Sequence, residues 1–187
     1  MNWPNILTVF RIFLTFFFLK FISLEGFFSK LIASGFFTLA ALTDSLDGYL
    51  ARKYQCITDF GKLMDPIEDK FLVLSAFYIF AQAHIISRWM FAVILIREVG
   101  ITAFRIAMIR KGKVLAAENG GKIKTILQMI VVYIILIYML VVEAHILSQS
   151  YSWWMTGINI LMWLTVIVTV SSGLSFLSNN RKSLYVG

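Results

Sequence analysis

IVVYIILIYMLVV, residues 130–142, decides the class of fold, because so long a run without a charged side chain does not suit the surface of a soluble domain. INILMWLTVIVTV, residues 158–170, has the same character. Of the 187 residues, 59% are hydrophobic and 14% are charged, whereas about 25% are charged in ordinary soluble proteins. The composition therefore predicts an integral membrane protein.

A transmembrane helix needs about 20 apolar residues, and six segments come close to this length. We predict an all-α polytopic membrane protein with six transmembrane helices in a single domain, residues 1–187. The expected spans are 5–24, 29–52, 62–84, 88–110, 122–147 and 153–178. Arg11 and Lys20 lie near the ends of the first span, where we expect them to snorkel. Residues 2–6 are expected to form a short interfacial lead-in, because Pro4 favours a break and Trp3 favours the interface.

The charge pattern predicts the orientation. The net charge is +7, and the basic residues flank apolar segments, so we expect contacts with anionic lipid headgroups and no nucleic-acid partner. Three basic residues lie on one side, namely Lys20, Lys30 and Arg88, and ten lie on the other, namely Arg52, Lys53, Lys62, Arg110, Lys111, Lys113, Lys122, Lys124, Arg181 and Lys182. The richer side, with both termini, is predicted to face the cytoplasm from a bacterial-type cytoplasmic membrane. The single cysteine, Cys56, is expected to be a free thiol.

Carboxylates gather in one window, TDSLDGYLARKYQCITDFGKLMDPIEDK, residues 43–70. It holds all five aspartates of the chain and Glu68. Asp44 and Asp47 are spaced i,i+3, and Asp65 and Asp69 are spaced i,i+4, so each pair shares one face of a helix. A short connection makes the two helices antiparallel neighbours, and their acidic faces can then oppose each other.

Four facing carboxylates repel one another and require cations. Mg²⁺ and Mn²⁺ prefer carboxylate oxygens, and the window has no histidine. We therefore expect two divalent cations that bridge phosphate oxygens. Taken singly, an aspartate here can equally be a solvated or capping residue, and the arrangement as a whole favours a function. A divalent-cation transporter is the alternative from another class of protein, although the outer halves of these helices continue without acidic residues.

The window carries a resemblance to a known family. Asp44-x2-Asp47-Gly48-x2-Ala51-Arg52-x8-Gly61-x3-Asp65-x3-Asp69 matches the full signature of the CDP-alcohol phosphotransferase family. Further segments resemble its phosphatidylglycerophosphate synthase branch: Asn5-Ile6-Leu7-Thr8-x2-Arg11, Arg97-Glu98, Arg105, Gly121-Lys122-Ile123-Lys124-Thr125 and Gln128-Met129. The resemblance thus spans most of the chain and is weakest in the last predicted helix.

The resemblance implies transfer of a phosphatidyl group from a CDP-linked donor to an alcohol, with release of CMP. It implies that Asp44, Asp47 and Asp65 hold one metal ion, that Asp44, Asp65 and Asp69 hold the other, and that Asp69 is also the catalytic base. The residues implied to bind the cytidine diphosphate are Gly48, Ala51, Arg52 and Gly61, with Asn5 and Thr8. The family resemblance also implies a homodimer.

Four cations are candidates for binding a phosphate on the acceptor. Arg97 and Arg105 are spaced i,i+8 and lie near one face of their helix, while Lys122 and Lys124 open the next helix. Arg105 is the leading candidate, and Arg97 is nearly as well explained by a structural pair with Glu98 or with a partner on another helix. For the two lysines, the positive-inside rule is an equally good explanation.

The leading function is the reaction of CDP-diacylglycerol with glycerol 3-phosphate to give phosphatidylglycerophosphate and CMP, a step of phospholipid biosynthesis. The alternative within the family is another acceptor, namely phosphatidylglycerol, serine or inositol phosphate. Three roles remain open for Glu68: a peripheral metal ligand, a partner of Lys62 or Lys70, or a solvated residue. Asp59 is expected in the loop of the window as a solvated or capping residue, and Glu143 and His145 are expected to be solvated.

Overall fold

Six helices make up the described part of the chain. The computed structural model describes residues 3–54, 59–110, 120–145 and 151–180, and it describes side chains over 10–43, 70–108, 121–145 and 152–180. In chain order the helices are α1 (Trp3–Ile22), α2 (Phe27–Tyr54), α3 (Asp59–Gln82), α4 (Arg88–Arg110), α5 (Gly120–Glu143) and α6 (Tyr151–Asn179). None of the described residues forms a strand. The all-α prediction is confirmed, and each helix overlaps one predicted segment along most of its length.

Two predictions at helix starts are wrong. Residues 3–6 form no separate lead-in, because α1 is continuous from Trp3. The N–H groups of a first helical turn have no acceptor within the helix, so Pro4 removes no hydrogen bond and its fixed φ suits the helix. Asp59, which we expected in a loop, is the first residue of α3.

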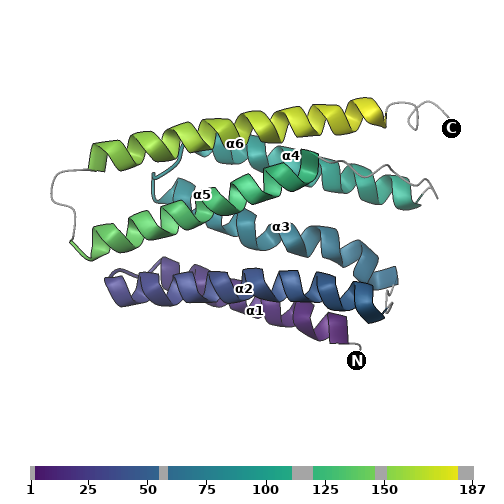
Figure 1. Cartoon of the computed structure of the whole chain (residues 1–187), viewed down its shortest axis with the longest axis horizontal. Coiled ribbons are helices and arrows are strands. Elements are labelled where there is room, and N and C mark those ends of the chain that lie inside the picture. Colours follow the sequence, from purple (N-terminus) through teal and green to yellow (C-terminus); the bar gives the residue numbers. More distant parts are fainter. Residues whose placement is uncertain (1–2, 55–58, 111–119, 146–150, 181–187) are drawn as a thin grey trace.

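The helices form a closed ring. Each packs against two neighbours in the order α1, α2, α5, α6, α4, α3 and back to α1, and α3 also contacts α2 and α5. Figure 1 shows that α1 begins and α6 ends at the same end of this elongated bundle. Because successive helices alternate in direction, this end collects the ends of α2 and α4 and the start of α3. We call it the N-terminal end, and the opposite one the far end.

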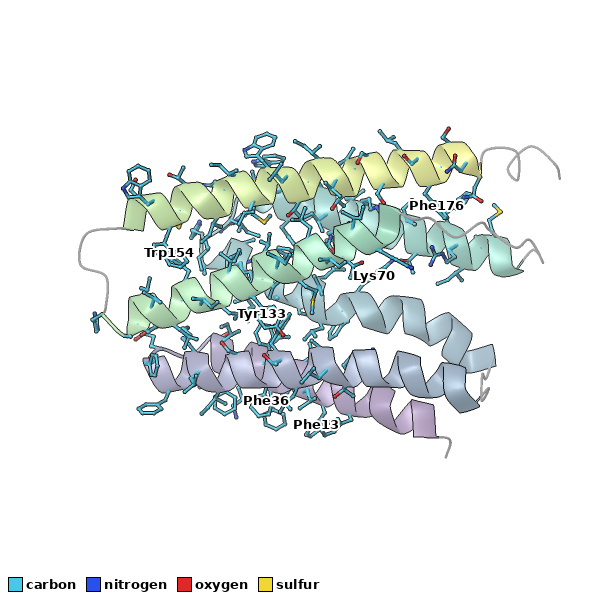
Figure 2. The ribbon with its side chains drawn as sticks, in the orientation of Figure 1. Phe13, Phe36, Lys70, Tyr133, Trp154 and Phe176 are labelled. Atoms are coloured by element: carbon cyan, nitrogen blue, oxygen red, sulfur yellow. The ribbon has the colours of Figure 1, made fainter. Side chains whose placement is uncertain are left out.

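Aromatic side chains fill the interior of the ring. The rings of Phe18 on α1 and Phe37 on α2 lie 5.4 Å apart, and Phe37 meets Tyr133 on α5 edge-on at 5.5 Å. Figure 2 shows Tyr133 between α5 and α2. Phe77 and Phe80 of α3 are also fully buried. Such close aromatic pairs stabilise the contact of the three helices beyond the burial of apolar area.

The outer surface is also apolar. Every helix exposes large hydrophobic side chains, for example Phe13 on α1, Phe28 on α2, Phe71 on α3, Ile96 on α4, Ile123 on α5 and Trp153 on α6. Patches on this scale mark contact with lipid or protein rather than water. Within the described residues, two stretches are long and apolar enough to cross a membrane, namely Gly121–Glu143 and Ser152–Asn179. The apolar stretches Phe27–Thr43 and Lys70–Gln82 are shorter.

Polar contacts tie the helices together at the far end. Lys30 is buried and donates to the carbonyl oxygens of Ile22 at 2.7 Å and Leu24 at 2.8 Å, where α1 ends. Glu143 is not simply solvated as we expected, because its Oε2 accepts a 3.1 Å hydrogen bond from the backbone N–H of Gly26. Gly26 has a φ of 98°, in the region that glycine adopts without steric cost. His145 is exposed, as predicted.

Candidate functional site

The acidic signature lies on two helices that contact each other. Asp44 and Asp47 are on α2, and Asp65 and Asp69 are on α3. Both segments are near the N-terminal end, and α2 contacts α3. The side chains of these aspartates lie outside those that the structure describes, as do those of Asn5, Thr8, Gly48, Ala51, Arg52, Gly61 and Glu68. Because both segments are helical, Asp44 and Asp47 share one face of α2, and Asp65 and Asp69 share one face of α3. The assignments of metal and cytidine diphosphate ligands stay predictions.

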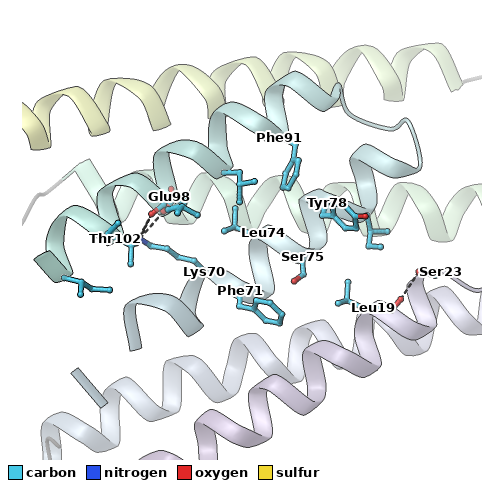
Figure 3. Close-up of a pocket in the computed structure, with 15 residues that line it drawn as sticks. Leu19, Ser23, Lys70, Phe71, Leu74, Ser75, Tyr78, Phe91, Glu98 and Thr102 are labelled. Carbon is cyan, nitrogen blue, oxygen red and sulfur yellow. Dashed lines mark hydrogen bonds and ion pairs between the residues drawn. The ribbon is translucent and has the colours of Figure 1, made fainter. Parts of the chain in front are cut away.

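Lys70 is the first described side chain of α3 and follows Asp69 directly. Its Nζ donates a hydrogen bond to the hydroxyl of Thr102 on α4 and lies 3.4 Å from Oε2 of Glu98. Figure 3 shows Lys70 reaching across from α3 to these two residues. Thr102 in turn donates to the backbone carbonyl of Glu98 at 2.7 Å. Lys70 therefore fixes α3 to α4 one residue beyond the predicted base.

Glu98 is the centre of a buried ion-pair cluster. Its side chain is 2% exposed, and its Oε1 lies 2.5 Å from Nζ of Lys124 on α5 and 3.2 Å from a terminal nitrogen of Arg97. With Lys70, three cations surround one carboxylate. A buried carboxylate is stable only when it is paired in this way. The described cluster, which we call the Glu98 cluster, carries a formal surplus of two positive charges.

Arg97 and Arg105 both reach toward α6, in agreement with the prediction that they lie near one face of α4. Arg97 donates to the hydroxyl of Ser172 at 2.7 Å, and its pairing with Glu98 is confirmed. The guanidinium carbon of Arg105 lies 5.6 Å from the centre of the Phe176 ring, which is a cation–π distance. Figure 2 marks Phe176 near the C-terminal part of α6.

Two further polar groups belong to the start of α5. Lys122 is exposed and so differs from Lys124, which is buried. Gln128 lies one turn after Lys124 and is buried, and its Nε2 has no hydrogen-bond partner among the described residues. A buried amide nitrogen without an acceptor is costly. It is therefore a donor suited to a bound polar ligand or water.

A cavity of about 640 Å³ lies over α3 between α1 and α4. Apolar side chains form most of its wall, including Phe71, Leu74 and Phe91, and Lys70 and Thr102 lie at one end. Figure 3 shows these residues around the space. A cavity with an apolar wall and a few polar groups at one end suits an amphipathic molecule with a hydrocarbon part.

Sequence reasoning missed the role of Glu98 and Lys70. Lys70 is one of two possible partners of Glu68 by sequence, and the structure places it against Glu98. The available signal was that a carboxylate in the apolar stretch of α4 needs a cation. Among the described side chains, which do not include those of the four aspartates, no group of three His, Cys, Asp or Glu residues is placed to hold a metal ion.

The expectation that Arg11 snorkels is also wrong, because Arg11 is 3% exposed. It shares the inward face of α1 with Leu14, Thr15 and Phe18, which are spaced at i+3, i+4 and i+7. Its backbone carbonyl accepts a 2.9 Å hydrogen bond from the Thr15 hydroxyl. Lys20 is exposed as expected.

The acidic signature on α2 and α3 and the Glu98 cluster on α3, α4 and α5 are the two charged features of the candidate site. The chain belongs to the CDP-alcohol phosphatidyltransferase family, whose model matches residues 1–171. The resemblance read from the signature is thereby confirmed.

Named relatives narrow the comparison. The chain is 38% identical over 148 residues to the CDP-diacylglycerol–glycerol-3-phosphate 3-phosphatidyltransferase of Bacillus subtilis (strain 168). The aligned region covers 79% of this chain and 72% of the relative. It is 33% identical over 188 residues to the protein of the same name from Escherichia coli (strain K12), covering 98% and 97%. A probable phosphatidylglycerophosphate synthase of Mycobacterium tuberculosis (strain ATCC 25618 / H37Rv) is 38% identical over 134 residues, 70% of this chain and 64% of that one.

Proposed function

We propose that the protein transfers the phosphatidyl group of CDP-diacylglycerol to glycerol 3-phosphate, giving phosphatidylglycerophosphate and CMP. The observation that carries the proposal is the Glu98 cluster, which begins at Lys70, one residue after Asp69. A cationic site beside the acidic signature suits an acceptor that bears its own phosphate. The names of the relatives agree with this acceptor.

The four aspartates would hold two divalent cations, Mg²⁺ or Mn²⁺. Asp44, Asp47 and Asp65 would bind one ion, and Asp44, Asp65 and Asp69 the other, as the family resemblance implies. The donor set fits hard cations, because it contains only carboxylates and lies on two helices in contact. When bound, the ions neutralise the diphosphate and the charge on the leaving CMP.

The protein groups would bind both substrates and move one proton. Gly48, Ala51, Arg52 and Gly61, with Asn5 and Thr8, would hold the cytidine diphosphate. Asp69 would accept the proton of the acceptor hydroxyl. The hydroxyl oxygen forms a bond to the β-phosphorus, and the bond from that phosphorus to the bridging oxygen breaks. CMP then leaves with the electron pair of that bond.

The acceptor phosphate would bind to Lys124 and Arg105, with Arg97 and Lys122 completing the cationic surroundings. Lys124 is buried within the Glu98 cluster, and Arg105 is held over Phe176. Charge-assisted hydrogen bonds to phosphate are about twice as strong as neutral ones. Gln128, whose Nε2 has no partner among the described residues, adds a neutral donor on the same side of α5 as Lys124.

We further propose six membrane spans, with the N-terminal end in the cytoplasm, both termini on that side, and a homodimeric assembly. The apolar side chains exposed on all six helices support six spans, and the ten-to-three division of basic residues supports the orientation. The transporter alternative gains no support. The described side chains of α2 and α3, residues 27–43 and 70–82, include no carboxylate or imidazole to continue an ion path.

The test is CMP release by the purified protein in detergent, with CDP-diacylglycerol and glycerol 3-phosphate. We expect activity with Mg²⁺ or Mn²⁺, loss of activity with a chelator, and recovery when metal is restored. Phosphatidylglycerol, serine and inositol phosphate are offered separately and in competition. Product from one of these acceptors and none from glycerol 3-phosphate would show that the branch assignment is wrong.

A further inference from the structure

Among the described side chains, Glu98 contacts cations from three helices in one place. Its Oε1 lies 2.5 Å from Lys124 of α5 and its Oε2 lies 3.4 Å from Lys70 of α3, while Arg97 of α4 adds a contact at 3.2 Å. Lysine side chains are long and flexible, and like charges repel. Thr102 also holds Lys70, but among the described side chains Glu98 is the carboxylate that contacts both ammonium groups.

The charges of the cluster match those of a phosphate monoester. Three cations and one carboxylate leave a formal charge of +2, and a phosphate monoester carries about −1.5 to −2 at neutral pH. An ammonium group has three N–H donors. Glu98 accepts one from Lys124, which leaves donors on the same nitrogen for an anion. The carboxylate thus orients the cations without using up their capacity to bind.

We propose that Glu98 is the positioning residue of the acceptor site, and that it sets the preference for a dianionic phosphate acceptor by fixing Lys124 close to Lys70, the residue that follows Asp69 in the chain. The inference rests on the proposed function, because it assigns the Glu98 cluster to the acceptor. Glu98 does not touch the substrate on this account and acts through the two lysines.

The substitution Glu98→Gln separates this role from simple charge balance. It raises the formal charge of the cluster from +2 to +3. If Glu98 only neutralised charge, the variant would bind the anionic acceptor more tightly and its KM for glycerol 3-phosphate would fall. If Glu98 positions the lysines, the KM rises about tenfold or more in spite of the added charge, which corresponds to the loss of about one charge-assisted contact.

The experiment measures kcat and both KM values for the wild type, Glu98→Gln and the matched control Glu143→Gln. Glu143 undergoes the same chemical change at the far end, where it contacts Gly26. We expect the KM for glycerol 3-phosphate to rise only in Glu98→Gln, with the KM for CDP-diacylglycerol within about threefold of wild type. An unchanged or lowered KM for glycerol 3-phosphate in the folded variant overturns the inference.

Two further variants cover the case in which Glu98→Gln does not fold. Glu98→Asp keeps the charge but shortens the reach, so its KM for glycerol 3-phosphate must also rise, and a wild-type value overturns the proposal. Lys124→Met tests whether Glu98 acts on the acceptor through Lys124. In the Glu98→Asp/Lys124→Met double variant the two effects must be less than additive, because both act on one contact, and full additivity overturns the proposal. A wild type that turns over other acceptors only would instead refute the proposed function.

Discussion

Gly173 of α6 offers a way to move Arg97 without changing any charge. Gly173 is buried against the Arg97 side chain. A Cβ atom added at this glycine would lie 3.2 Å from both Cγ and Nε of Arg97. Non-bonded carbon atoms prefer separations of about 3.5–4.0 Å. Even the smallest side chain therefore requires Arg97 to shift by a few tenths of an ångström, roughly the difference between these distances.

A graded pair of substitutions follows from this geometry. Gly173→Ala requires only the small shift, so Arg97 keeps its 2.7 Å hydrogen bond to Ser172 and its 3.2 Å contact with Glu98 in strained form. Gly173→Leu fills the space of the Arg97 side chain and forces the guanidinium away from both partners. A hydrogen bond to a charged group contributes about 1.5–3 kcal/mol. Each 1.4 kcal/mol corresponds to about a factor of ten, so Gly173→Leu should raise the KM for glycerol 3-phosphate by about tenfold or more.

The assay is CMP release at varied glycerol 3-phosphate and saturating CDP-diacylglycerol, together with thermal unfolding in detergent. Gly157→Leu is the matched control, because Gly157 lies on the same helix and a Cβ there meets nothing within 4 Å. We expect wild-type kinetics for Gly157→Leu, a modest rise in KM for Gly173→Ala and a large one for Gly173→Leu. A folded Gly173→Leu protein with the wild-type KM would refute the reasoning and leave Arg97 as a purely structural tie to α6.

Two other predictions concern separate parts of the molecule. Asp69→Asn should lower kcat about 10²- to 10⁴-fold through the loss of the base, measured as CMP release, and near-full activity with metal still bound would contradict the assignment. Lys30→Met should lower stability by about 1–3 kcal/mol, because it leaves the carbonyls of Ile22 and Leu24 without their donor. Thermal unfolding measures that effect, and both KM values should stay at wild type; a changed KM for glycerol 3-phosphate would contradict a role confined to the far end.

The helices were predictable because their signals are local. Apolar runs, bounded by charged or glycine-containing connections, place each helix within a few residues. The ring order was not predictable, because it depends on which faces meet. The contact of Phe37 with Tyr133 joins α2 to α5, residues far apart in sequence. The inward turn of Arg11 has the same origin, since the packing of α1 against its neighbours decides which of its faces is buried.

The two parts of the candidate site, the aspartates and the Glu98 cluster, also differ in how far the sequence alone predicts them. The aspartates follow a fixed spacing along the chain, so sequence alone assigns them a shared helical face and, through the family signature, a function. In the Glu98 cluster, by contrast, Lys70 is 28 positions from Glu98 in the sequence and Lys124 is 26 positions from it. Such pairs depend on the rotation of three helices about their axes. Sequence therefore supplied Lys124 as a candidate cation but gave no reason to pair it with Glu98.

Lys70 follows Asp69 directly in the chain and so connects the aspartates with the Glu98 cluster. Successive residues of an α-helix are about 100° apart around its axis, so α3 presents residue 69 to one side and residue 70 to another. The side of α3 that carries Lys70 is held against α4, because Lys70 contacts Thr102 and Glu98 there. Any rotation of α3 that moves the proposed base would also break the contacts of Lys70. On the proposed mechanism, the Glu98 cluster therefore does more than bind a phosphate, since it sets the rotation of the helix that carries the base relative to the acceptor.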